Sequence, residues 1–172
     1  SIGKVFAYNS TPCGEFGHTI RTRSGHCVQC NPAAISFILR HVSYGRVYIA
    51  GSINGQLIKI GQTSNKGNRA ISLNRNKYGN QNDWEILFSF SCVNSGEIES
   101  KSQALLSPFL ASDVKYKKEN KLQEASELFR CSYSRAKEAL IKVTNDLNID
   151  MIEVNQKTKM IDSYNFKTLR RL

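Results

Sequence analysis

The sequence lacks any long apolar run, and this absence excludes one class of partner. No segment approaches the roughly 18 consecutive apolar residues of a membrane-spanning helix, so we expect no membrane partner. The N-terminus also lacks the basic-then-apolar plan of a secretion signal, which favours a cytoplasmic protein. Internal repeats and low-complexity tracts are missing as well. With 40% hydrophobic and 22% charged residues, the composition argues against a disordered chain and against a coiled coil.

Acidic side chains are scarce. The chain has 14 Asp and Glu against 24 Lys and Arg, which gives a formal net charge of +10. Such an excess favours a polyanionic partner, although a merely basic, soluble protein explains the charge equally well. The excess is spread over the whole chain, which suits a long surface along a phosphate backbone better than a single basic arm.

The basic residues are dense in one place, shortly after Asp113. Four lysines stand close together there: Lys115, Lys117, Lys118 and Lys121. We expect this segment to be an exposed loop or the start of a helix. The lysines either contact DNA or belong to a solvated linker, and the charge alone leaves both interpretations open.

The cysteines are odd in number, five in all, which favours reduced thiols over a disulfide framework. Cys27 and Cys30 form a CxxC pair that lets two thiolates reach one tetrahedral ion, and Cys13 offers a third ligand. His18 is favoured over His26 as the fourth, because neighbouring residues rarely both point at one ion. We therefore predict a structural Zn²⁺ site. A redox pair or simple thiols are the alternatives, but the strand-then-helix setting of a thioredoxin-like motif is missing.

The hydrophobic pattern predicts the order of elements in the first two thirds of the chain. Asn31-Pro32 is a helix start, and Asn54-Gly55 between two β-rich runs is a strong hairpin signal. The predicted elements are a helix over 32–42, strands over 46–50, 57–61 and 84–92, and helices over 65–78 and 94–107. This order indicates an α+β fold in which a small antiparallel three-stranded sheet is flanked by helices.

The last third is predicted to be mainly helical. Residues 122–129 and 133–147 have the pattern of two helices joined by a short turn, with Ser132 capping the second helix. This pair resembles a helix-turn-helix that would bring Arg135 to DNA, and an ordinary helical hairpin is the alternative. Short strands are expected over 149–154 and 160–166. The chain is accordingly divided into a zinc loop with its helix (1–44), a core (45–112) and a helical tail (113–172).

One ordered series of residues stands out in the middle third. Val47-Tyr48-Ile49 lies on the first strand of the predicted hairpin, and Lys59-Ile60-Gly61 lies on the second. Arg69 follows on a helix, and Glu99 follows on a later one. This series resembles the GIY-YIG nuclease family over roughly residues 45–110. Lys59 stands where most members have Tyr, which is similar to a branch that includes some short restriction enzymes.

The resemblance implies a metal-dependent DNA endonuclease that leaves 5′-phosphate and 3′-hydroxyl ends. Tyr48 would act as general base on the attacking water or position it, with Lys59 as the neighbouring cation. Alternatively, Lys59 is itself the base. Arg69 would bind the scissile phosphate. Glu99 would hold one Mg²⁺ or Mn²⁺, which prefer oxygen ligands, while its competitor Glu97 is better explained as a capping residue.

The implied partner is double-stranded DNA. Asn74 and Tyr78 lie one and two turns beyond Arg69, on roughly the same face, and are expected to contact phosphate. A single active site cuts one strand at a time, so double-strand cleavage needs a homodimer on DNA or two sequential nicks. The chain is similar both to phage-type homing enzymes and to restriction enzymes, acting in a bacterial or phage-infected cell, and the sequence does not separate these roles.

Two other functions compete with the endonuclease. The main alternative is a non-catalytic DNA-binding module that uses the zinc loop and the helix-turn-helix. A nuclease for RNA or for branched DNA is the second. Substrate comparisons would separate all three.

Overall fold

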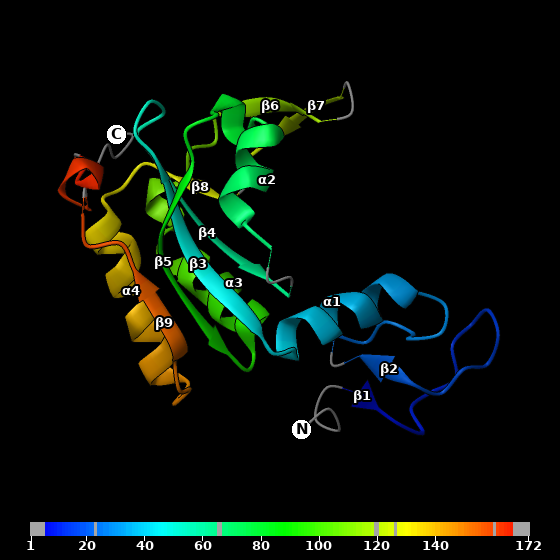
Figure 1. The fold of residues 1–172 in the computed structure, drawn as a ribbon. Coiled ribbons are helices and arrows are strands. Elements are labelled where there is room, and N and C mark those ends of the chain that lie inside the picture. The colour runs from blue at the N-terminus through cyan, green and yellow to red at the C-terminus, as the bar shows by residue number, and fades with distance from the viewer. Residues whose placement is uncertain are drawn as a thin grey trace. The chain divides into compact units, whose positions relative to one another are not determined.

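The computed structural model describes residues 6–22, 24–64, 67–118, 121–125, 127–159 and 161–166 (Figure 1). The chain divides into two units, Ser1–Ser43 (unit 1) and Tyr44–Leu172 (unit 2). Within the described ranges, none of the helices combines the length and the apolar character needed to span a lipid bilayer.

Unit 1 contains a short antiparallel ladder, the cysteine-bearing loops and a helix. Strand β1 (Phe6–Ala7) pairs with β2 (Arg21–Thr22). Helix α1 (Pro32–Val42) has proline in its first turn, which confirms the predicted start, since the fixed φ of proline suits that position. Gly17 and Gly25 have φ values of 69° and 87°, a region that side chains disfavour, and they let the loops turn back tightly.

An antiparallel five-stranded sheet lies at the centre of unit 2, with the order β8-β4-β3-β5-β9. Its strands are β3 (Gly45–Ser52), β4 (Leu57–Thr63), β5 (Glu85–Cys92), β8 (Leu128–Phe129) and β9 (Ile152–Gln156). β3 and β4 form the hairpin that Asn54-Gly55 predicts. The α+β class is confirmed. The three-stranded sheet is wrong, because β8 and β9 extend the sheet at both edges.

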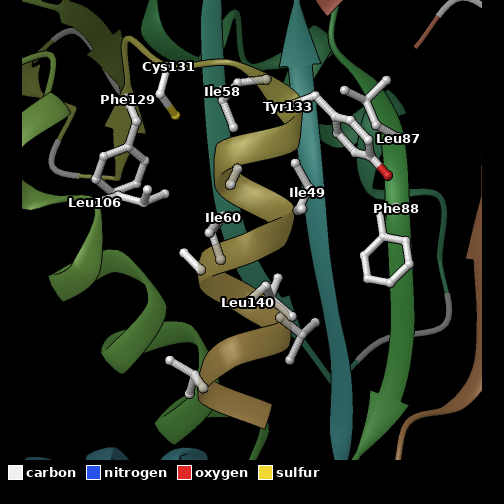
Figure 2. Close-up of a cluster of buried hydrophobic side chains, with 14 of the residues drawn as sticks. Ile49, Ile58, Ile60, Leu87, Phe88, Leu106, Phe129, Cys131, Tyr133 and Leu140 are labelled. Carbon is white, nitrogen blue, oxygen red and sulfur yellow. The ribbon is translucent and has the colours of Figure 1, made fainter. Parts of the chain in front are cut away.

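Helices α3 (Ser95–Leu105) and α4 (Tyr133–Asp146) pack against one face of this sheet. Figure 2 shows Leu140 of α4 over Ile49 and Ile60 of the central strands, and all three side chains are buried. Burying one such side chain stabilises the fold by roughly 1.5–3 kcal/mol. The α4 helix starts where predicted, since the Ser132 hydroxyl accepts the N–H of Arg135 at 3.2 Å.

The opposite face of the sheet is partly covered by α2 (Arg69–Arg75) and the segment that leads into β5. Leu73 and Trp84 are buried there against the sheet residues Ala50 and Leu57. α2 starts later than the predicted helix over 65–78, because Asn68 caps it, and residues 65 and 66 lie outside the described residues. It also ends earlier, because Lys77 adopts a left-handed φ of 44° and a 3₁₀ turn (Tyr78–Asn80) follows. This partial cover positions the candidate site, which lies on the same face.

The last third is not a separate helical tail, and the predicted helix-turn-helix is wrong. Its first helix is replaced by β7 (Lys121–Glu124) and β8, which follow β6 (Lys115–Lys118). Leu128 and Phe129 are buried, and β8 pairs with β4, so tertiary pairing overrides the local helical pattern. Met160 lies outside the described residues, and the rest of the predicted terminal strand contains a 3₁₀ turn (Ile161–Tyr164).

The residues of the last third that are predicted to contact DNA lie on other secondary structure, or contact other residues, than the sequence predicts. β6 and β7 pair as a hairpin, so the lysine cluster lies on strands rather than on a loop or helix start. Lys115 forms an exposed ion pair with Glu124 at 3.7 Å. The backbones of Lys117 and Lys118 lie in β6, and their side chains lie outside the described residues. Arg135 stacks over the ring of Phe109 at 5.3 Å, which gives this residue a packing role.

Candidate functional site

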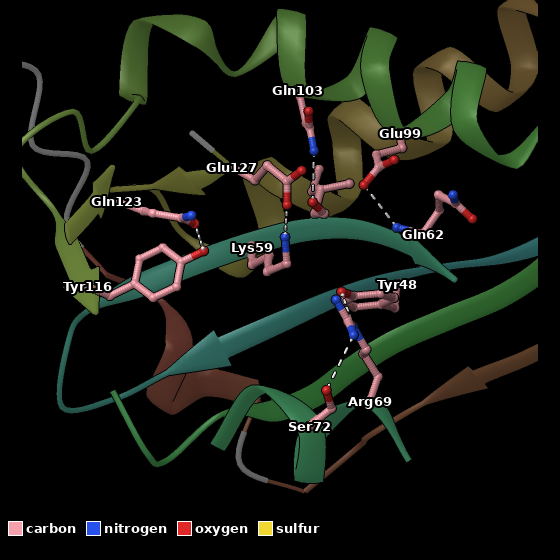
Figure 3. Close-up of polar contacts among 11 residues, drawn as sticks. Tyr48, Lys59, Gln62, Arg69, Ser72, Glu99, Gln103, Tyr116, Gln123 and Glu127 are labelled. Atoms are coloured by element: carbon pink, nitrogen blue, oxygen red, sulfur yellow. Dashed lines mark hydrogen bonds and ion pairs between the residues drawn. The ribbon is translucent and has the colours of Figure 1, made fainter. Parts of the chain in front are cut away.

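Tyr48 of β3 and Arg69 of α2 meet at the centre of the candidate site (Figure 3). The Arg69 Nε donates to Tyr48 Oη at 3.0 Å, and its Nη1 lies 3.4 Å from Ser72 Oγ. The side chain of Asn68 accepts the N–H groups of Ala70 and Ile71 and so fixes the start of α2 beside the sheet. Burial lowers the pKa of Arg69, but the hydrogen bond and charge interaction with Tyr48 outweigh it, so the pKa is raised overall.

The Tyr48 ring reaches this position because it lies across Gly61 of the neighbouring strand. Tyr48 and Gly61 are paired in the β3–β4 register. A Cβ atom at Gly61 would stand 2.4 Å from Tyr48 Oη and 2.6 Å from its Cζ, which no side chain could occupy. The glycine of the second strand therefore provides the space that holds the phenol over β4.

A groove of about 510 Å³ opens beside this pair, on the same face of the sheet. Tyr48 and Arg69 line it, together with Arg46, Ser89, Asn155 and Lys157. The groove thus combines guanidinium, ammonium, hydroxyl and amide groups. These groups suit a phosphodiester, because each can donate a hydrogen bond to phosphate oxygens and the cations offset its charge.

Lys59 lies on the same face of β4 but faces another partner. Lys59 as a whole is only 1% exposed. Its ammonium forms an ion pair with Glu127 and lies 4.8 Å from the ring centre of Tyr78. The structure therefore brings Lys59 to Glu127, rather than to the Tyr48 phenol as the sequence suggested. Glu127 was missed because its partner is 68 residues away along the chain, and its local sequence carries no signal for this pairing.

The Lys59–Glu127 pair gives a prediction for stability. Removing one partner of a fully buried ion pair costs roughly 3–5 kcal/mol, because the other charge is left uncompensated. Since the Glu127 side chain is 33% exposed, we expect a smaller loss for Glu127→Ala, about 2 kcal/mol. Urea unfolding followed by the emission of Trp84, the single tryptophan, measures it.

Two further variants complete that measurement. Glu124→Ala removes an exposed carboxylate that pairs with Lys115, and it should change the free energy of unfolding little. The double variant Lys59→Met/Glu127→Ala should regain most of the stability, because no buried charge remains. Equal urea midpoints for Glu127→Ala and the parent protein would show that this ion pair contributes nothing.

Glu99 of α3 lies at the edge of β4 and is 6% exposed. Its Oε1 accepts the backbone N–H of Gln62 at 3.0 Å, and Gln103, one turn later, donates to the carbonyl of Ile60 at 3.0 Å. Figure 3 shows both side chains descending from α3 to β4. β8 pairs with β4 only at Ile58 and Lys59. Beyond that ladder, the side chains of Glu99 and Gln103 form hydrogen bonds with the backbone of β4 in place of a strand. Glu99 and Tyr48 therefore approach consecutive residues of one strand, Gln62 and Gly61.

The competing carboxylate, Glu97, points elsewhere. It forms an ion pair with Lys101 at 2.9 Å, one turn further along the same helix. Of the two carboxylates weighed from the sequence, Glu99 is the one held at the sheet.

The side chains of Asn74 and Tyr78, which are predicted to contact phosphate, make contacts within the fold. The Asn74 amide donates to the carbonyl of Trp84 at 3.0 Å and accepts its N–H at 2.6 Å. Both ends of the amide are thus used to hold the start of β5. The Tyr78 ring covers Lys59 and packs against Tyr116 with ring centres 4.8 Å apart. Burial, and then the nearby Glu127 carboxylate, raise the pKa of Tyr78.

The four predicted zinc ligands of unit 1 come together. The ligand atoms of Cys13, His18, Cys27 and Cys30 all lie within 4.8 Å of one another, which supports His18 over His26. The Sγ atoms of Cys13 and Cys30 are 3.7 Å apart, and His18 Nδ1 lies 3.6 Å and 3.4 Å from the sulfurs of Cys27 and Cys30. Tetrahedral bonds to zinc place two sulfurs about 3.8 Å apart and sulfur and nitrogen about 3.6 Å apart. The donor set and its spacing therefore fit zinc.

The backbone around this cluster favours a thiolate. Phe16 N lies 3.5 Å from Cys13 Sγ, and this contact is the main reason why the pKa of Cys13 is lowered to about 6. The pKa of Cys30 is instead raised to about 12, chiefly by its neighbour Cys27. Opposite shifts of this kind are expected when thiols crowd one point and must share its negative charge.

Comparison with known protein families decides the relationship of this chain. The family model of the T5orf172 domain matches residues 45–144, which is more than half of the sequence. The chain belongs to the T5orf172 domain family. The resemblance drawn from the sequence named the wrong family, since the match is to the T5orf172 domain and not to GIY-YIG. Separate searches of curated proteins and of solved structures returned no match.

The T5orf172 domain is associated with nuclease and DNA-binding functions. Its matched range contains Tyr48, Lys59, Arg69, Glu99 and Glu127, so the polar centre of unit 2 lies inside it. The Cys and His cluster precedes this range, and strand β9 follows it. The candidate site thus combines the T5orf172 domain with a strand that the family match does not include.

Proposed function

We propose that this protein is a metal-dependent endonuclease that hydrolyses phosphodiester bonds of double-stranded DNA. The observation that carries the proposal is the Arg69–Tyr48 hydrogen bond at the side of a basic groove. A guanidinium beside a phenol supplies two things that this hydrolysis needs: charge neutralisation at a phosphate and an oxygen that can orient water. Membership of the T5orf172 domain family supports the same class of activity.

Each residue has a distinct role in this proposal. Arg69 binds the scissile phosphate and offsets the charge that grows in the transition state. Tyr48 holds the attacking water at Oη and, in its phenolate form, accepts one proton from it. Lys59 keeps a positive charge under the same face of the sheet, and Glu127 fixes its position. The products are a 5′-phosphate and a 3′-hydroxyl.

Glu99 fits a single Mg²⁺ or Mn²⁺. It offers one buried carboxylate oriented by the Gln62 N–H, and hard divalent ions are often held by one carboxylate plus waters and substrate phosphate. When bound, such an ion supplies charge stabilisation at the departing 3′ oxygen. In unit 1, we propose that Cys13, His18, Cys27 and Cys30 hold a structural Zn²⁺, since the thiolates suit zinc and not magnesium.

The experiment that tests the function is incubation of plasmid and phage DNA with Mg²⁺ or Mn²⁺, followed by mapping of the cut ends. We expect cleavage that requires the added ion. Glu99→Gln should lower the rate about a hundredfold, because the carboxylate is lost while the amide oxygen can still accept the Gln62 N–H. No cleavage by the parent protein on varied DNA would refute the endonuclease.

Glu97→Gln is the matched control, because it changes a carboxylate on the same helix that pairs with Lys101. We expect this variant to cut at the parent rate. Full activity of Glu99→Gln would refute the assignment of Glu99 as the metal ligand. The mapped ends also assign the biological role: a homing enzyme cuts long degenerate sites, and a restriction enzyme cuts short exact ones. A symmetric stagger indicates a dimer on DNA, and separate nicks indicate sequential action.

A further inference from the structure

The outer wall of the groove is formed by β9, a strand beyond the matched family range. The sheet register places Asn155 of β9 opposite Ser89 of β5, and Ser89 opposite Tyr48 of β3. Directly paired residues point to the same face of a sheet. Asn155, Ser89 and Tyr48 therefore form one row across three neighbouring strands, and all three line the groove.

Two cations flank this row. Arg46 lies two residues before Tyr48 on β3, and Lys157 follows the end of β9. Both line the groove, and their side chains are 34% and 49% exposed. With Arg69 they give the groove three cations on one face, which complements a chain of phosphates.

Each flanking cation is held in place by a carboxylate. Arg46 Nη2 donates to Glu153 at 3.0 Å, and Lys157 Nζ donates to Glu85 at 2.7 Å. The Glu153 carboxylate also accepts the hydroxyl of Ser91 at 3.0 Å. The backbone of Glu153 has a φ of 51°, a conformation that is rare for glutamate. These bonds leave donors available, because a guanidinium has five N–H groups and an ammonium three.

We propose that β9 binds the DNA backbone beside the scissile phosphate, with Asn155 and Lys157 as the contacting side chains. The inference rests on the proposed function for placing that phosphate at Tyr48 and Arg69. Two strand spacings separate β3 from β9, about 10 Å, which corresponds to about three base-pair steps along the helix axis of B-DNA. Contacts to phosphate set register and affinity but carry no sequence information. β9 therefore positions the substrate and does not select it.

The test is the affinity for a short fluorescent DNA duplex at several salt concentrations. Buffer without added divalent ions and without chelator keeps zinc in place while preventing hydrolysis. We expect Lys157→Ala to weaken binding about fivefold and to lower the slope of log K against log salt by about 1. Asn155→Ala should weaken binding about threefold with an unchanged slope, because it removes a neutral donor. Lys157→Arg should restore both the affinity and the slope.

The matched control is Lys142→Ala, which removes an exposed lysine paired with Asp146 at 2.9 Å on α4. This variant should bind DNA as the parent protein does, and Trp84 emission reports that unit 2 is folded in every variant. Unchanged affinity and slope for Lys157→Ala would overturn the inference even if the parent protein cuts DNA. A weakened Lys157→Ala together with a parent protein that does not cut in Mg²⁺ would refute the endonuclease and support the groove assignment.

Discussion

Arg69→Ala is expected to lower the rate of DNA cleavage about a thousandfold while leaving the fold intact. Arg69 is the cation that touches Tyr48, at 3.0 Å, and it lies in the groove. Removing a donor aimed at the charge of the transition state costs about 10²–10³ in rate, and an arginine acting on a transferring phosphoryl group contributes up to about 10⁵. Single-turnover cleavage at saturating protein measures the loss, because it separates chemistry from binding.

Two variants show whether the loss is specific to this side chain. Arg75→Ala removes an exposed arginine from the last turn of the same helix, and it should cut at close to the parent rate. Arg69→Lys should recover little, because an ammonium cannot contact Tyr48 and a phosphate in the geometry of the planar guanidinium. If Arg75→Ala loses as much activity as Arg69→Ala, the effect reflects the charge of α2 and not the Tyr48 contact.

Removing zinc is expected to unfold unit 1 and to leave unit 2 folded. Structural zinc contributes about 10–16 kcal/mol of apparent binding free energy in small zinc domains. Unit 1 has short strands and one described helix to hold its loops, so we expect that contribution to decide its folding. The hydrophobic clusters that surround the sheet consist of residues from Val47 onward, so their packing should survive. A strong chelator, followed by limited proteolysis and Trp84 emission, measures both units at once.

Histidine variants make the ligand assignment testable. His18→Ala should lose zinc to a chelator much faster than the parent protein, because His18 Nδ1 belongs to the cluster. His26→Ala should retain about one zinc per chain, because His26 adjoins Cys27 in the sequence but is not one of the four clustered residues. Equal zinc content in both variants, with the parent value, would show that neither histidine is a ligand. Zinc release measured with a colorimetric dye gives the stoichiometry.

Local signals in the sequence predicted the parts of the molecule that depend on near neighbours. The hairpin follows from Asn54-Gly55, because the turn chemistry acts over a few residues. The Cys and His cluster follows from ligand spacing within 18 residues of chain. The start of α4 follows from Ser132, whose capping bond spans three residues. These features need no knowledge of the rest of the fold.

Features that depend on distant partners could not be predicted in the same way. β8 has a helical sequence pattern, and it forms a strand because Leu128 and Phe129 pair with β4. Asn74 looked like a phosphate contact, but Trp84, ten residues later, takes both ends of its amide. The role of Asn155 becomes visible only once β9 is known to pair with β5. The family name was also wrong, because short triplets on a hairpin are weaker markers than a match over a whole domain.

The hydrogen bond between Glu99 and the Gln62 N–H has a consequence for the solubility of variants that lack it. An uncovered strand edge is a template on which another chain can add a strand and begin to aggregate. Glu99 and Gln103 cover the end of β4 with side chains. A mutation that removes the Glu99 oxygen acceptor would therefore remove the proposed metal ligand and uncover that edge together. Glu99 variants without an oxygen acceptor should therefore be recovered as insoluble protein more often than as folded but inactive protein. Arg69 variants should be recovered mainly as folded but inactive protein.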